Sequence, residues 1–101
     1  MHIATVSYDG IAKIWLIKTD AQINSLIAEC DSGYPILTIT EISDGVVAFG
    51  GDNCVVTVWN WRNNYVISRS FGHLGSVSSL FTYQNGLYSL GGDTKLKKWA
   101  V

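Results

Sequence analysis

Three residues in the last third of the chain, His73, Ser89 and Asp93, have the side-chain types of a serine hydrolase. Such an enzyme needs a serine that a neighbouring base activates, usually on a sharp turn that leads into a helix. Ser89 instead lies within a strand-like run, GLYSLG, where nothing of this kind activates it. The sequence therefore predicts a structural role for these residues and no enzymatic activity.

Metal and phosphate chemistry are disfavoured for similar reasons. The two histidines, His2 and His73, are far apart in the sequence, and the acidic residues occur one per turn rather than in clusters. The runs Gly50-Gly51-Asp52 and Gly91-Gly92-Asp93 resemble phosphate loops, but they lead into strands, whereas a phosphate loop opens a helix. We expect neither a metal nor a cofactor.

The composition narrows the class of protein further. The chain is 48% hydrophobic and 15% charged, as in globular domains, and its formal net charge of -1 attracts neither nucleic acid nor acidic membranes. Its apolar stretches are too short to cross a bilayer, and its N-terminus lacks a signal-peptide pattern. Because neither pattern is present, we predict a cytoplasmic or nuclear location. Cys30 and Cys54 lack the spacing of a metal or redox site, so we predict that both are buried free thiols.

The elements that must position these residues are predicted to be strands. Short runs rich in Val, Ile, Thr, Tyr and Trp alternate with clusters of Asp, Asn and Gly, which is the pattern of strands and tight turns. Two of the turns, Asp44-Gly45 and Asn85-Gly86, are favoured two-residue hairpin turns. Ten strands are predicted, over residues 2–7, 11–17, 22–29, 36–42, 46–50, 55–61, 65–71, 77–83, 87–90 and 95–100.

Three units of this pattern repeat along the chain. Trp15, Trp59 and Trp99 stand 44 and 40 residues apart, and each ends a run with apolar alternation, so we predict core positions for them. A turn residue precedes them by six, seven and six residues, namely Asp9, Asp52 and Asp93. In the middle unit either one turn residue is extra or Asn53 takes the acidic position. A period of about 40 to 45 residues is typical of a propeller blade, a four-stranded antiparallel sheet.

The last unit resembles the repeat of the WD-repeat family, whose signatures are a Gly-His pair and a Trp-Asp pair. The matching residues are Gly72, His73, Ser89, Asp93 and Trp99, and the resemblance extends over essentially the whole chain. It implies an all-β partial β-propeller, in which ten antiparallel strands form one complete and two incomplete four-stranded blades. With strands lettered a to d from the centre outwards, residues 1–31 supply b, c and d, residues 32–72 a complete blade, and residues 73–101 a, b and c.

In this family a loop His, a strand Ser or Thr, a turn Asp and a strand Trp form a hydrogen-bonded tetrad within the blade. The resemblance implies one complete and one partial tetrad, formed by His73, Ser89, Asp93 and Trp99 and by Thr5, Asp9 and Trp15. Losing one member would leave buried polar groups unpaired, at roughly 1 to 3 kcal/mol each.

The middle unit departs from this pattern. Aligned through Gly45 and Gly86, its His position falls on Ser32 and its Ser position falls on Ala48. We therefore expect no tetrad in the middle unit, whose stability must come from packing.

Lys98 is a second departure, because it takes the strand position held by Ile14 and Val58 in the other units. An unpaired buried charge costs several kcal/mol, so we expect Lys98 at an exposed edge or beside an acidic partner. The residue after each Trp is also never the Asp of the family signature.

These features together predict a noncatalytic scaffold that binds protein partners or peptides, and they disfavour membrane or nucleic-acid binding. Exposed aromatic residues on loops are frequent binding anchors. The candidate contact positions, taken from where the family binds, are Tyr8, Tyr34, Leu37, Ser76, Ser78 and Gly92.

Ten strands cannot close a ring of about four to eight blades, so the open sides need a cover. We expect the remaining blades or another subunit to supply it, with this chain as the C-terminal part of a larger propeller or multiprotein assembly. One alternative is a structural subunit that completes a ring by self-association or with another propeller chain. A propeller-type hydrolase is a third and weaker alternative.

Overall fold

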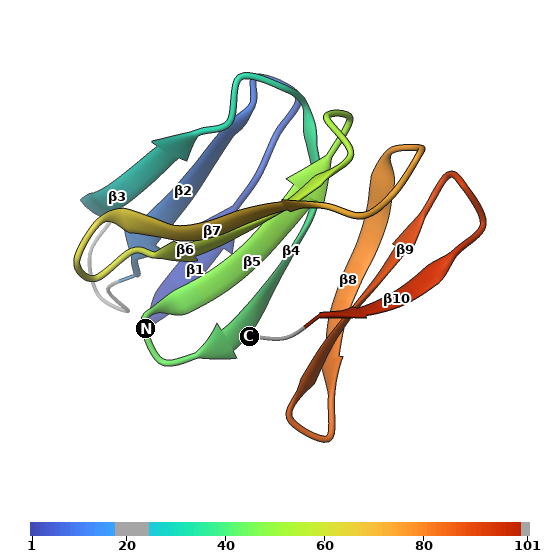
Figure 1. The fold of residues 1–101 in the computed structure, drawn as a ribbon. Coiled ribbons are helices and arrows are strands. Elements are labelled where there is room, and N and C mark those ends of the chain that lie inside the picture. The colour runs from blue at the N-terminus through green and yellow to red at the C-terminus, as the bar shows by residue number, and fades with distance from the viewer. Residues whose placement is uncertain (18–24, 100–101) are drawn as a thin grey trace.

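The chain consists of strands and turns over the residues that its computed structural model describes, 1–17 and 25–99 (Figure 1). The strands are β1 (His2–Thr5), β2 (Ile11–Leu16), β3 (Ser25–Asp31), β4 (Ile36–Ser43), β5 (Val46–Gly51), β6 (Val55–Asn60), β7 (Tyr65–Phe71), β8 (Val77–Tyr83), β9 (Gly86–Gly91) and β10 (Leu96–Trp99). These ten antiparallel strands confirm the predicted fold class. Residues 22–24 and 100, also predicted as strand, lie outside the described residues.

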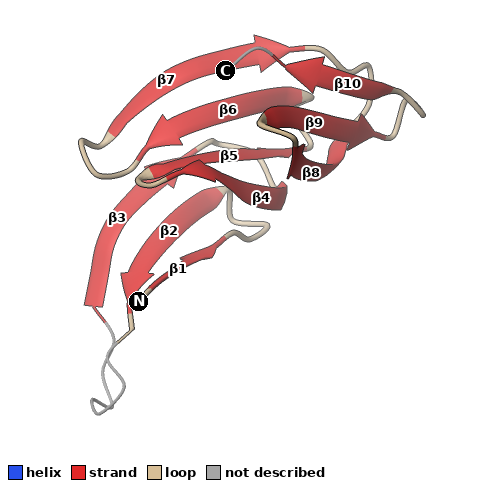
Figure 2. Ribbon diagram, turned by 90° about the horizontal axis from the view of Figure 1, so that it is seen from below, coloured by secondary structure: helices blue, strands red, loops and turns tan. Residues whose placement is uncertain are grey.

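The strands form three sheets that follow one another along the chain (Figure 2). The first sheet has the order β1-β2-β3, the middle sheet β4-β5-β6-β7 and the last sheet β8-β9-β10. Their strands fall within residues 1–31, 32–72 and 73–101, respectively. Among the described residues the middle sheet alone therefore has a fourth strand.

The middle sheet is buried on both faces because each neighbouring sheet covers one of them. Successive side chains of a strand point to opposite faces. Val47, Phe49 and Trp59 belong to the core shared with the first sheet. Ala48 and Val58 belong to the core shared with the last sheet. The two central strands, β5 and β6, are consequently apolar at nearly every position.

Hydrogen bonds between the sheets add to this apolar packing. The inner strands β4 and β8 lie beside each other, and the Leu80 amide donates to the Thr38 hydroxyl at 3.1 Å. Between the first and middle sheets, the Ile36 amide donates to the Ser7 carbonyl at 3.1 Å. Directional bonds thus fix how each sheet lies against the next.

The outward faces of the first and last sheets are not covered by any of the described residues. Ile3 and Leu26 on the first sheet are 40% and 44% exposed, and Phe81 and Leu96 on the last sheet are 38% and 60% exposed. Trp15 was predicted to be core but is only half-buried, because it lies opposite Ile3 on this outward face.

One hairpin turn differs from the sequence prediction. Between β4 and β5 the turn is Asp44-Gly45, as predicted, and Gly45 has a φ of +84°. Between β8 and β9 the turn residues are Gln84 and Asn85, with φ values of +47° and +64°. Gly86 is already paired with Tyr83 in the strand, so the predicted Asn85-Gly86 turn is wrong by one residue.

The burial of the two cysteines differs from expectation, and the structure also buries a tryptophan whose burial was not predicted from the sequence. Both cysteines are free, but neither is fully buried: Cys30 is half-buried on β3, and Cys54 lies in the β5–β6 turn with a φ of +62°. Trp61, which stands outside the repeat pattern, is only 8% exposed and packs in the core between the first and middle sheets.

The described residues contain no helix that is long and apolar enough to cross a membrane.

Candidate functional site

Equivalent positions in the three sheets follow from the strand register. The tryptophans lie opposite an apolar residue of the preceding strand, in the pairs Trp15 and Ile3, Trp59 and Val47, and Trp99 and Leu87. Two residues beyond that apolar residue, on the same face, come Thr5, Phe49 and Ser89. Six residues before each tryptophan, in the turn, come Asp9, Asn53 and Asp93.

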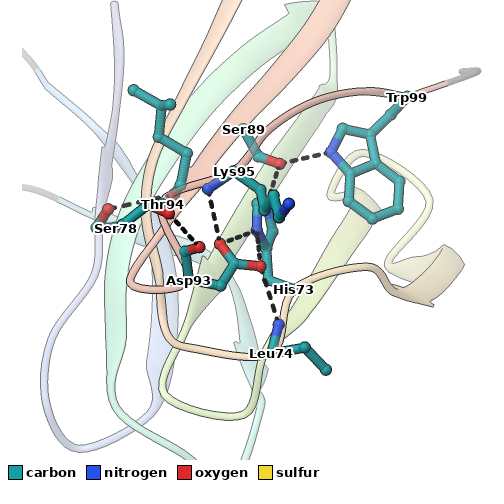
Figure 3. Close-up of polar contacts among 9 residues, drawn as sticks. His73, Leu74, Ser78, Ser89, Asp93, Thr94, Lys95 and Trp99 are labelled. Carbon is teal, nitrogen blue, oxygen red and sulfur yellow. Dashed lines mark hydrogen bonds and ion pairs between the residues drawn. The ribbon is translucent and has the colours of Figure 1, made fainter.

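In the last sheet the four residues of the family-like tetrad come together in one hydrogen-bonded relay (Figure 3). The Trp99 indole N–H donates to the Ser89 hydroxyl at 2.7 Å. The Ser89 hydroxyl lies 2.6 Å from Nε2 of His73, and Nδ1 of His73 lies 3.0 Å from Oδ1 of Asp93. Ser89 and His73 are 0% and 5% exposed, so the centre of the relay is closed to solvent.

The chemistry of the end groups sets the direction of donation. An ionised carboxylate only accepts, so the His73 ring hydrogen lies on Nδ1 and points at Asp93. Nε2 then accepts from the Ser89 hydroxyl, whose oxygen accepts from Trp99. With donation from Nδ1 and acceptance at Nε2, each group of the relay is paired, and no buried side-chain nitrogen or oxygen of the described residues lacks a partner.

Asp93 ends the relay and also holds its own turn. Its carboxylate accepts from the Leu74 amide at 3.0 Å and from the Lys95 amide at 3.1 Å. Desolvation raises the pKa of this carboxyl, but the hydrogen bonds from His73 and from the two amides outweigh it and lower the pKa to about 2. Asp93 is therefore a fixed negative charge at neutral pH.

Two glycines leave the space that the relay needs. A Cβ on Gly91 would lie 2.6 Å from Nδ1 of His73, and a Cβ on Gly72 would lie 2.2 Å from the ring of Trp99. Both distances are shorter than side-chain packing allows. Any side chain at these two positions would displace the relay.

The first sheet carries a shorter version of the relay. The Trp15 indole N–H donates to the Thr5 hydroxyl at 3.0 Å, and Asp9 accepts from an amide of its own turn at 2.9 Å. Ser7 is equivalent to Gly91 of the last sheet, and its hydroxyl donates to the Asp9 carboxylate. The hydrogen bonds from Ser7 and from the turn amide lower the pKa of Asp9. Thr5 and Trp15 meet, whereas Asp9 is engaged within its turn.

Among the described residues, the middle sheet forms no relay of this kind. The sequence alignment, however, matched the wrong residue with Ser89. The register places Phe49, not Ala48, at that position. Phe49 meets Trp59 edge to face, with ring centroids 6.4 Å apart and an angle of 82° between the planes. Ser32, aligned with the relay histidine, donates to backbone carbonyls instead. An aromatic pair thus replaces the polar groups.

In the middle turn Asn53 takes the acidic position. Its side-chain oxygen accepts from the Val55 amide at 3.2 Å, as the acids of the other two turns do from their own amides. The neighbouring Asp52 accepts instead from the Ser76 hydroxyl of the last sheet at 2.8 Å. Asp52 therefore joins two sheets rather than closing one turn.

Lys98 lies exposed on the outward face of β10. Its Nζ lies 5.9 Å from the ring centroid of Tyr88, and that ring stacks on Phe81 at 5.6 Å. The equivalent residues, Ile14 and Val58, are buried between sheets. The outward face of the last sheet therefore differs in chemistry from the two covered interfaces.

Two of the candidate contact residues, Tyr8 and Tyr34, share one edge of the molecule. They are 76% and 55% exposed. The turn that carries Tyr8 and the loop that carries Tyr34 are joined, because the Ser32 amide donates to the Gly10 carbonyl at 2.8 Å. The two aromatic side chains are thus presented by connected backbone.

The other four candidate contact residues differ in accessibility. Leu37, Ser78 and Gly92 are exposed, and Ser76 is half-buried where it contacts Asp52. The Ser78 hydroxyl also donates to a backbone carbonyl, at 3.2 Å. The serine hydroxyls are therefore partly used inside the protein.

No family model matches the chain. The DENN domain and WD repeat-containing protein SCD1 of Arabidopsis thaliana is 24% identical over 100 residues, which are 99% of this chain and 8% of that protein. The crystal structure of the WD40 β-propeller domain of Doa1 matches with a TM-score of 0.78 and 20% identity, over 97% of this chain and 33% of that chain. The computationally designed Ika4 protein matches with a TM-score of 0.85 and 21% identity, over 99% of this chain and 60% of that chain.

These likenesses and the three sheets establish the fold, which is a partial β-propeller similar to the WD40 propeller domain of Doa1. Each sheet is one blade or part of one. The chain spans less than two thirds of the length of each of these relatives.

Proposed function

We propose that the chain is a noncatalytic scaffold that binds protein partners or peptides through the edge formed by Tyr8 and Tyr34. The observation that carries the proposal is that both exposed aromatic residues stand on backbone segments that are hydrogen-bonded to each other. Aromatic anchors held in place before binding lose little conformational entropy on association. A surface of this kind suits recognition of another macromolecule.

Close packing of the backbone supports the rigidity of this edge. A Cβ on Gly10 would lie only 3.0 Å from the backbone nitrogen of Tyr34, so the turn and the loop touch directly. The Ser32 hydroxyl donates to the carbonyls of both Gly10 and Tyr34, at 3.0 and 2.8 Å. The loop has few ways to move without breaking these bonds.

The noncatalytic part of the proposal rests on the burial of Ser89. A nucleophile must reach its substrate, whereas Ser89 is 0% exposed and its hydroxyl is held between His73 and Trp99. The relay therefore serves as a structural tie between a loop and two strands.

The scaffold is proposed to belong to a larger propeller or multiprotein assembly, whose remaining blades or another subunit cover the outward faces. Apolar side chains such as Ile3 and Leu96 favour such a cover, because exposed apolar faces and open strand edges promote association. A position at the C-terminal end of that assembly and a cytoplasmic or nuclear location stay predictions.

The same outward faces favour a second candidate, a structural subunit that completes a ring with other copies. Light scattering over a range of concentrations tests it. A particle mass that is a multiple of 11.1 kDa supports self-association, whereas a stable monomer of 11.1 kDa contradicts the need for a cover in both proposals.

The proposed binding edge is tested by comparing the proteins that the chain and a variant of this edge capture. The chain and its Tyr8→Ala/Tyr34→Ala variant are immobilised, and the bound proteins are identified. We expect the variant to lose the specific partners while its melting temperature shifts by only a few degrees, because surface substitutions usually change stability by under about 0.5 kcal/mol.

Tyr83→Ala is the matched control, because Tyr83 is an exposed tyrosine (61%) at a different hairpin. Equal loss of partners with Tyr83→Ala, or no loss with the double variant, would contradict the proposed edge. A large fall in melting temperature would assign Tyr8 or Tyr34 to the folded core instead.

A further inference from the structure

A groove of about 500 Å³ opens between the first and middle sheets, next to the edge that carries Tyr34. The β3–β4 loop, with Asp31 and Tyr34, forms one wall, and the end of β7, with Arg69 and Phe71, forms the other. The middle sheet contributes Thr57 to the lining. Tyr34 and Phe71 are 55% and 80% exposed, so two aromatic rings stand at its borders.

The two arginines of the middle sheet are used differently. Arg62 pairs with Asp44 at 2.7 Å and lies 4.7 Å over the ring of Trp61. Arg69 takes part in none of the ion pairs within residues 1–17 and 25–99, although it lines the groove. Asp31 on the facing wall accepts from an amide of its own loop at 2.8 Å. Among the described residues, the groove thus holds a guanidinium that forms no ion pair, with the Asp31 carboxylate on the opposite wall.

The strand register pairs Arg69 with Thr57, so the exposed Arg69 side chain lies on the face of the middle sheet that is turned toward the first sheet. Burial raises the pKa of the Cys30 thiol, and the Arg69 guanidinium beside it acts in the opposite direction. Cys30 belongs to β3 and Arg69 to β7, so the arginine reaches across from one sheet to the other. Its planar fork of N–H donors matches the two oxygens of a carboxylate.

We propose that this groove binds an extended segment of a protein partner that carries a Glu or Asp side chain beside an apolar side chain. The carboxylate pairs with Arg69, and the apolar side chain packs against Tyr34 and Phe71. The Arg69 guanidinium, which forms no ion pair among the described residues, and the exposed rings of Tyr34 and Phe71 favour this occupant. The inference rests on the proposed scaffold function and names the chemistry of its partner.

The test uses acetylated, amidated peptides of alanine that contain one Glu and one Leu, separated by one, two or three residues. Binding to the full chain is measured by fluorescence anisotropy, and the contact surface by amide chemical shifts. We expect at least one spacing to bind, with shifts at Tyr34, Arg69 and Phe71. Replacing Glu by Gln in that peptide should weaken binding about tenfold.

Arg69→Gln should weaken binding of the Glu peptide by the same factor and leave the Gln peptide unaffected, because the two changes remove one interaction. Phe71→Ser should weaken both peptides. Arg62→Gln is the matched control and should change neither affinity, because Arg62 is already paired with Asp44.

The assignment would be overturned if the Arg69→Gln variant bound the Glu peptide as tightly as the unsubstituted chain does, or if no peptide of the set bound. Shifts confined to Tyr8 would also overturn it while leaving the scaffold function standing. Conversely, peptides could bind specifically in the groove while the Tyr8→Ala/Tyr34→Ala variant still captured its partners. That outcome would contradict only the proposal that partners bind through the edge formed by Tyr8 and Tyr34.

Discussion

The last and middle sheets both place a tryptophan at the same position of their third strand. In the last sheet this tryptophan is hydrogen-bonded to a polar side chain, whereas in the middle sheet it packs against an aromatic ring. Trp99 ends a polar relay through Ser89, whereas Trp59 meets Phe49 edge to face. The middle sheet is covered on both faces, so burial of apolar area stabilises it directly. The last sheet is covered on one face, and hydrogen bonds tie its loop to its strands.

The first sheet stands between these two solutions. It keeps the indole-to-hydroxyl bond from Trp15 to Thr5, but Ser7 fills the position where the last sheet has Gly91. In the last sheet a Cβ on Gly91 would lie 2.6 Å from Nδ1 of His73, so the imidazole needs a glycine at this position. In the first sheet the hydroxyl of Ser7, at the equivalent position, donates to Asp9.

The largest expected change in stability comes from the substitution Phe49→Ser, which puts a serine in the middle sheet at the position that Ser89 occupies in the last sheet. Phe49→Ser leaves a hydroxyl and a cavity beside Trp59, with no histidine to pair with. Because truncation of a buried Phe costs about 3 to 5 kcal/mol, the free energy of unfolding should fall by that amount. Urea unfolding measures it, with the exposed Ser43→Ala as control. A fall in the free energy of unfolding of less than about 1 kcal/mol would show that a serine and a phenylalanine are interchangeable at this position.

A smaller effect is expected from Gly91→Ala, which adds a Cβ 2.6 Å from Nδ1 of His73. Overpacking of this kind costs about 1 to 3 kcal/mol. In a His73→Ala background the same substitution should cost less than half as much, because the clashing ring is gone. Urea unfolding of the four proteins gives the coupling energy, and an equal cost in both backgrounds would argue against the steric role of Gly91.

The smallest effect is a dependence of stability on acidity. The pKa of Asp93 lies at about 2 in the folded protein, below the ordinary value of 3.8. A lowered folded pKa contributes stability that is complete above the unfolded pKa and is lost as the pH falls from about 4 through 2. The difference in urea midpoint between the chain and Asp93→Asn should therefore shrink over this range. A constant difference from pH 7 to pH 2 would refute the relay as the cause.

The fold was largely predictable from the sequence, because strand alternation and the spacing of Trp15, Trp59 and Trp99 are local patterns. The placement of His73, Ser89, Asp93 and Trp99 followed from resemblance, and the structure shows the distances that join them.

The register of the middle sheet was not predictable in the same way. The alignment through glycines fails because Gly45 lies in a turn whereas Gly86 lies in a strand. A shift of one residue turns every side chain to the other face of a sheet, so Phe49 and not Ala48 meets Trp59. The burial of Trp61 was missed for a related reason, since its contacts come from the neighbouring sheet.

The sequence by itself thus determined the all-β class and the three repeating units, because these depend on composition and periodicity along the chain, whereas the relay residues came from the resemblance to the WD-repeat family. Only the tertiary structure decided which faces are covered, that the Ser7 hydroxyl donates to Asp9, and that Arg69 lines a groove next to Tyr34 and Phe71. Contacts between sheets join residues far apart in the chain, and their geometry depends on registers that no local pattern specifies.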